Sequence, residues 1–89
     1  MIEKDITIIN KLGLHARAAA KFVQTASRFA SKVEVNNDTK TINAKSIMGV
    51  MMLAAGQGTV LKIIVNGEDE VAAMNALEEL INNRFGEES

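Results

Sequence analysis

The only histidine of the chain, His15, lies in the stretch GLHARAAAKFV at residues 13–23, two positions before Arg17. There a β-branched, strand-like run gives way to an alanine-rich, helix-like run, with Gly13 between the two. A neutral imidazole is a nucleophile, and a guanidinium can bind two phosphate oxygens at once. The pair therefore indicates phosphoryl chemistry at a junction between a strand and a helix.

A helix that begins near Ala16 would add backbone donors to this junction. The N–H groups of Ala16, Arg17 and Ala18 would lack acceptors within the helix and would point toward the loop that carries His15. The positive end of the helix dipole attracts anions and disfavours an imidazolium. Phosphoryl transfer mainly needs positioning and dispersal of charge, which these groups offer without a metal. The alternative, in which His15 merely caps or decorates the junction, stays open.

Other kinds of site find little support in the composition. The chain has no cysteine, so thiolate chemistry and sulfur-ligated zinc are excluded, and one histidine leaves no His-rich metal cluster. No catalytic triad has a candidate, and Gly56-Gln57-Gly58 is too short for a nucleotide-binding loop. We therefore expect neither a metal nor a cofactor.

The length of 89 residues predicts a single domain over residues 1–89. No apolar run reaches the ~20 residues that a membrane helix requires, and the first residues lack the features of a signal peptide, so we expect a cytoplasmic protein. Residues 1–65 hold nine Lys and Arg against four Asp and Glu, whereas residues 66–89 hold one against seven. With only three Phe and no Tyr or Trp to stack on bases, this basic body favours an acidic protein partner over nucleic acid.

Apolar periodicity predicts four short strands and three helices. The strands are expected within residues 2–9, 32–37, 40–43 and 59–67. The helices are expected over about 16–30, over a short segment that Ser46 caps, and over about 69–84, with Arg84 near the end of the last. The expected apolar faces are Ala19, Phe22, Val23, Ala26, Phe29 and Ala30 in the first helix and Val71, Met74, Leu77 and Ile81 in the last. The order β-α-β-β-α-β-α predicts a sheet with helices on one face.

Two motifs carry a resemblance to a known family. GLHARAAAKFV at 13–23, together with NAKSIMGVMMLAAGQG at 43–58, resembles the HPr family, the histidine-containing phosphocarriers of the bacterial phosphoenolpyruvate-dependent phosphotransferase system. The resemblance covers essentially the whole chain. It implies an α+β fold, an open-faced β-sandwich of order βαββαβα, with a four-stranded antiparallel sheet in the order 1-4-2-3 and three helices on one face.

The resemblance also implies the roles of individual residues. His15 would accept a phosphoryl group from phosphorylated enzyme I on Nδ1 and pass it to a histidine of an A-type component, sugar-specific or nitrogen-related. The chain would thus be a phosphoryl carrier that forms a phosphohistidine, rather than a stand-alone enzyme. Arg17 would steady the phosphate. Ser46 stands where an ATP-dependent HPr kinase phosphorylates some members. Many members have proline shortly after the histidine, whereas this chain has Ala18, whose N–H is an additional helix donor.

The apolar residues after Ser46 outnumber those that one face of a short helix can bury. We assign Ile47, Met48 and Met51 to a docking patch beside His15, ringed by Arg17, Lys21 and Lys45, because flexible methionines adapt to several partners. Burial of the three apolar residues in the core, and a merely solvated Lys21, remain alternatives. Successive use by different proteins favours a modest patch on a monomer.

Two rival classes remain, a βαββαβ-type nucleic-acid module and a small-ligand regulatory domain. The first predicts exposed aromatic residues on central strands, and the second predicts a cleft lined by specific polar groups. The sequence shows neither clearly, and only a phosphoryl carrier uses His15.

Overall fold

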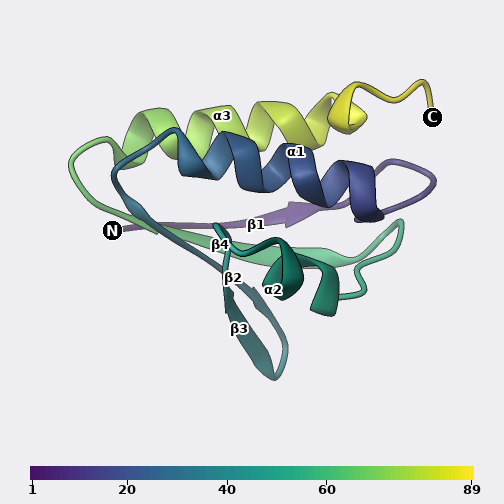
Figure 1. Ribbon diagram of the computed structural model, residues 1–89, viewed down its shortest axis with the longest axis horizontal. Helices are drawn as coiled ribbons and strands as arrows, with labels where there is room; N and C mark the ends of the chain where they lie inside the picture. The colour runs from purple at the N-terminus through teal and green to yellow at the C-terminus, as the bar shows by residue number, and fades with distance from the viewer.

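Residues 1–89 of the computed structural model form four strands, three α-helices and one short 3₁₀ turn (Figure 1). The strands are β1 (Ile2–Thr7), β2 (Lys32–Asn37), β3 (Lys40–Asn43) and β4 (Val60–Asn66). The helices are α1 (Ala16–Ser27), α2 (Ile47–Met52) and α3 (Glu70–Asn82), and the 3₁₀ turn η1 (Arg84–Gly86) follows. The predicted βαββαβα order is confirmed.

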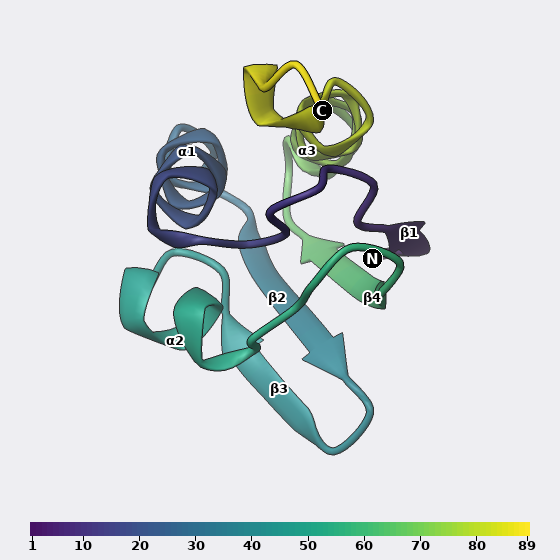
Figure 2. The same cartoon turned by 90° about the vertical axis from the view of Figure 1, so that its right-hand side faces the viewer.

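The strands pair into one antiparallel sheet in the order β1-β4-β2-β3. Alternate residues of each strand point to opposite faces, so β2 and β4 bury Val33, Val35, Leu61, Ile63 and Val65 on one side only. Figure 2 shows the helices on that side, with α1 and α3 next to each other and α2 below α1. The expected α+β open-faced sandwich, its strand order and its three helices on one face are confirmed.

The core lies between the sheet and the helices and consists of 21 buried hydrophobic residues. From α1 it receives Ala18, Ala19, Phe22 and Ala26, whose spacing of three and four residues places them on one helix face. Three of these four residues are alanines, so the helix backbone can lie close to its neighbours. No helix of the structure is long and apolar enough to cross a membrane.

Helix α1 ends at Ser27, three residues earlier than predicted. The backbone N–H groups of Ala30 and Ser31 donate to the Asp69 carboxylate at 2.9 Å each, and the Ser31 hydroxyl donates to it as well. These bonds lower the pKa of Asp69, the Ser31 hydroxyl contributing most. Because Asp69 lies 38 residues farther along the chain than Ser31, helical periodicity could not locate this end. Ala30, predicted on the apolar face, is exposed.

Two expectations about the last helix are wrong. Val71 was expected on the apolar face but is 61% exposed, because the face that meets the core consists of Ala73, Met74, Leu77 and Ile81. Arg84 lies beyond the helix, which ends at Asn82, and has a left-handed φ of 56°. The chain then turns through η1, which buries Phe85 completely.

Substitutions in α3 test this assignment of faces. Met74 is 1% exposed, so Met74→Ala is expected to lower the free energy of unfolding by about 2–5 kcal/mol through a core cavity. Val71→Ala, three residues away, is expected to change it by less than about 0.5 kcal/mol. Urea unfolding of both variants measures the difference. Equal losses of unfolding free energy in the two variants would instead indicate that Val71 packs against the core.

Candidate functional site

His15 is the N-cap residue of α1, with extended backbone angles (φ −73°, ψ 176°). Its carbonyl oxygen accepts the first helical hydrogen bond, from the Ala19 N–H at 2.8 Å. Its ring, however, makes no capping bond to the helix. The imidazole is therefore free of the cap role that the sequence left open, and it is available for other contacts.

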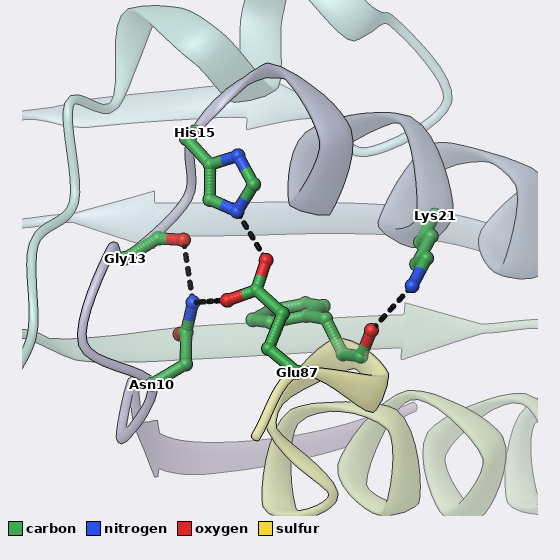
Figure 3. A network of polar contacts seen from close by, with 6 residues as sticks. Asn10, Gly13, His15, Lys21 and Glu87 are labelled. Carbon is green, nitrogen blue, oxygen red and sulfur yellow. Dashed lines mark hydrogen bonds and ion pairs between the residues drawn. The ribbon is translucent and has the colours of Figure 1, made fainter. Parts of the chain in front are cut away.

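The imidazole instead contacts the C-terminal tail, residues 84–89, as Figure 3 shows. Nε2 of His15 is hydrogen-bonded to Oε2 of Glu87. The other carboxylate oxygen, Oε1, accepts a bond of 2.9 Å from the side-chain amide of Asn10, which also donates to the Gly13 carbonyl at 2.8 Å. The second ring nitrogen, Nδ1, points away from Glu87. A fully buried asparagine thus connects the loop before His15 to the carboxylate that contacts the ring.

The same contacts set the charge of Glu87. The hydrogen bond from Asn10, followed by that from His15, holds the pKa of the Glu87 carboxyl below its usual value of 4.5, and the positive charge of Lys21 acts in the same direction. Glu87 is therefore ionised near neutral pH. Since a carboxylate only accepts hydrogen bonds, its contact with Nε2 requires the hydrogen to be on that nitrogen.

The tail is held by two further contacts. Phe85 is buried in the core, and its carbonyl oxygen accepts a 2.6 Å hydrogen bond from Nζ of Lys21 on α1. Gly86 has a left-handed φ of 79°, a conformation that glycine adopts readily, and it directs the chain from the buried ring back toward His15. The position of Glu87 is thus determined on both sides, by the core and by Asn10.

An open hollow lies next to the imidazole, bordered by Leu12, His15, Ala16, Arg17, Glu87 and Ser89. Arg17 is exposed, and its guanidinium has no hydrogen-bond or ion-pair partner in the chain. The backbone N–H groups of Ala16, Arg17 and Ala18 also make no hydrogen bonds. The helix start at Ala16 is as predicted, and it leaves unpaired donors and one free cation beside His15.

Comparison with known proteins identifies this arrangement. Residues 2–83 match the family described as PTS HPr component phosphorylation site. Over all 89 residues of both chains, the sequence is 56% identical to the phosphocarrier protein HPr of Xylella fastidiosa (strain Temecula1). The chain belongs to the HPr family. As an HPr, it is a phosphocarrier of the phosphotransferase system.

Solved HPr structures have the same fold. The crystal structure of HPr-C-His from Thermoanaerobacter tengcongensis has a TM-score of 0.96 and 55% identity, with full coverage of both chains. The crystal structure of an HPr dimer from the same organism has a TM-score of 0.79 over 98% of this chain and 100% of that one. The sequence resemblance to HPr is therefore confirmed in both sequence and fold.

The predicted docking residues lie on α2, which contacts α1. Ile47 is 42% exposed, Met48 68% and Met51 43%, so the alternative that they are core residues is wrong; only Val50 of this helix is buried. The predicted ring of cations is less free than expected, because Lys21 donates to Phe85 and Nζ of Lys45 donates to the Phe29 carbonyl at 2.7 Å. These two lysines have structural partners, whereas Arg17 has none.

Ser46 is the N-cap of α2, as predicted, and its hydroxyl oxygen accepts a 3.2 Å hydrogen bond from the Gly49 N–H. The residue is only partly buried. It therefore both caps the short helix and borders its exposed apolar side chains.

Sequence reasoning missed Asn10 and Glu87. Glu87 lies 72 residues beyond His15 in the chain, and nothing in its local sequence distinguishes it from the adjacent Glu88. The one available signal was the acidic C-terminal segment, which we interpreted only as a difference in charge.

The titration of Glu87 tests this network. We expect the Glu87 carboxyl to titrate below 4.5, and we expect its pKa to rise toward 4.5 in Asn10→Ala and, by less, in His15→Ala. Because folding lowers the pKa of Glu87, its contacts stabilise the fold fully at pH values above the pKa of the unfolded chain. This contribution to the free energy of unfolding is lost as the pH falls through the lower pKa of the folded protein. Carboxyl ¹³C shifts followed by NMR against pH measure this. A wild-type midpoint at or above 4.5 would contradict the network.

Proposed function

We propose that His15 accepts a phosphoryl group on Nδ1 from phosphorylated enzyme I and passes it to a histidine of an A-type component, sugar-specific or nitrogen-related. The proposed acting unit is the single domain of residues 1–89, working as a monomer in the cytoplasm with no need for nucleic acid or a cofactor. It forms a phosphohistidine intermediate and does not turn over a substrate alone.

One observation carries this proposal: the only imidazole of the chain borders a hollow that is also lined by Ala16 and Arg17, whose backbone N–H groups are unpaired, as is the Arg17 guanidinium. Such donors stabilise the oxygens of a phosphoryl group by charge-assisted hydrogen bonds. Ala16, Arg17 and Ala18 are the proposed backbone donors, and the Arg17 side chain is the proposed second anchor.

The proposed transfer step needs no metal. The lone pair of Nδ1 attacks phosphorus, and the bond from phosphorus to the donor atom breaks, with its electron pair remaining on the donor. Charge develops on the three transferred oxygens, where the N–H groups and Arg17 can compensate it. Delivery to the acceptor histidine is the same step with His15 as the leaving group.

The proposed docking surface is the exposed apolar patch Ile47, Met48 and Met51, together with the cations Arg17, Lys21 and Lys45. Its apolar centre suits partners that bind in succession, since methionine adapts to different shapes. The lysines keep positive charge beside acidic partners even though each donates one hydrogen bond within the chain.

Ser46 is the proposed site of regulatory phosphorylation by an HPr kinase. A phosphate there would carry about −1.5 to −2 charges at pH 7 and would face the first turn of α2, which tolerates negative charge. The helix would persist, but an acidic partner would meet a like charge beside Ile47 and Met48. The proposed effect is thus weaker docking without loss of fold.

Substitution of His15 tests the acceptor. Incubation with phosphoenolpyruvate and enzyme I is expected to add one acid-labile phosphate to the wild type and none to a folded His15→Ala variant, as intact mass shows before and after mild acid. Arg17→Ala keeps the nucleophile and is expected to label about 10- to 100-fold more slowly, because one phosphate-stabilising group is lost. Acid-labile labelling of His15→Ala would refute the acceptor.

Ser46→Asp tests the electrostatic mechanism. We expect labelling by enzyme I to slow at low salt and to recover partly at high salt, with the melting temperature unchanged. Thr39→Asp, which adds the same charge to the exposed turn between β2 and β3, is the control and is expected to label normally. Loss of labelling together with unfolding, or no loss at low salt, would rule this mechanism out.

A further inference from the structure

The C-terminal tail provides a group that acts on the imidazole from the side opposite its proposed nucleophilic nitrogen. We propose that Glu87 is a positioning residue for phosphoryl transfer: its carboxylate holds the ring hydrogen of His15 on Nε2, so that the lone pair lies on Nδ1. This inference rests on the proposed function of His15, and it adds the residue that selects the reactive nitrogen.

The carboxylate can play this role because its own position is fixed. Oε1 of Glu87 is bound to the amide of Asn10, which is completely buried and also binds the Gly13 carbonyl, two residues before His15. The amide must present its N–H₂ group to both oxygens, which leaves Oδ1 of Asn10 buried without a partner. A buried oxygen without a partner is unfavourable, so the two bonds of the N–H₂ group are made at the expense of this oxygen. Together these bonds hold the loop, the carboxylate and the ring in one arrangement.

The backbone of the tail supports the same conclusion. Arg84 and Phe85 are consecutive non-glycine residues with left-handed φ values of 56° and 54°. Such conformations are costly and persist only where the surroundings enforce them. Burial of Phe85 and the bond from Lys21 to its carbonyl enforce them here. As a result, the chain reverses direction after α3, and Glu87 lies at the start of α1.

The contact matters chemically at each stage of transfer. An imidazole with hydrogen on Nδ1 has no lone pair there and cannot attack from that atom. After Nδ1 has bonded to phosphorus, the hydrogen stays on Nε2 and the ring itself is positive, facing the Glu87 carboxylate. When the phosphoryl group leaves, the electron pair of the P–N bond returns to Nδ1 and the ring is again neutral, so no proton has to move.

The alternative effect of an acidic tail is repulsion of the incoming phosphoryl group. Glu87 contacts Nε2, whereas Nδ1 points away from it (Figure 3), so the carboxylate acts on the far side of the ring from the attacking nitrogen, even though Glu87 also borders the hollow beside His15. The geometry therefore favours positioning over repulsion, and the two effects predict opposite changes in rate when the carboxylate is removed.

The test compares Glu87→Ala and Glu87→Gln with Glu88→Gln, a change of the same kind at the adjacent, exposed residue. In mildly alkaline buffer, ¹⁵N NMR of the ring measures the two tautomers. We expect the Nε2–H form to dominate in the wild type and in Glu88→Gln. We expect Glu87→Ala to show a mixture and Glu87→Gln, whose amide oxygen still accepts from Nε2–H, to retain part of the preference.

The rate of phosphoryl acceptance from enzyme I gives the second readout. We expect kcat to fall about tenfold in Glu87→Ala, comparable to the smaller losses that follow removal of the hydrogen-bond partner of a metal-ligating histidine, with KM unchanged. Glu87→Gln is expected to lie between this variant and the wild type, and Glu88→Gln to equal the wild type. Circular dichroism confirms that each variant is folded.

The two proposals fail in different ways. If wild-type His15 acquires no acid-labile phosphate, the proposed function is wrong. Normal wild-type labelling with an unchanged tautomer ratio in Glu87→Ala would overturn only the role of Glu87. Faster acceptance by Glu87→Ala would also overturn it, in favour of repulsion by the tail.

Discussion

The site depends on the pairing of β4 with β1, which brings the loop that leaves β1 against the loop that enters β4. The Leu14 N–H donates to the Ala55 carbonyl at 2.8 Å across these loops. Gly13 has a left-handed φ of 66°, and a Cβ atom there would lie 2.5 Å from the same carbonyl oxygen. Only glycine fits so close an approach. This crossing fixes the backbone of His15 before α1 begins.

Charges of opposite sign then lie around the imidazole in a defined order. The free helix N–H groups and Arg17 offer positive potential to an anion in the hollow, while Glu87 contacts Nε2. An exposed guanidinium is flexible and solvated, whereas Glu87 is held by Asn10. Proposed phosphate binding thus combines fixed backbone donors with one adaptable side chain, and proposed orientation of the ring relies on a carboxylate that is held.

Much of the fold was predictable because local pattern and burial agree. Alternation in β2, followed by a turn and a short partner strand, predicted the bounds of β2 and β3 without error. Ser46 was recognised as a cap because its hydroxyl acts three residues away. The predictions of helix ends and helix faces are wrong where a residue distant in the sequence determines them. Asp69 binds the backbone of Ala30 and Ser31 just beyond the end of α1, and no local signal in the sequence reports that contact. Val71 fits a helical period as well as Ala73 does, but only the packed sheet determines which face is buried.

The sequence by itself determined the order of the elements, the position of His15 at the start of a helix and the presence of Arg17 beside it. These follow from propensity, periodicity and spacing within a few residues, which are local properties of the chain. The tertiary structure alone decided that Glu87 and Asn10 join His15 in one network, with Lys21 fixing the tail that carries Glu87. Contacts between residues 72 positions apart arise only when the core closes around Phe85, because that burial directs the tail back over the site.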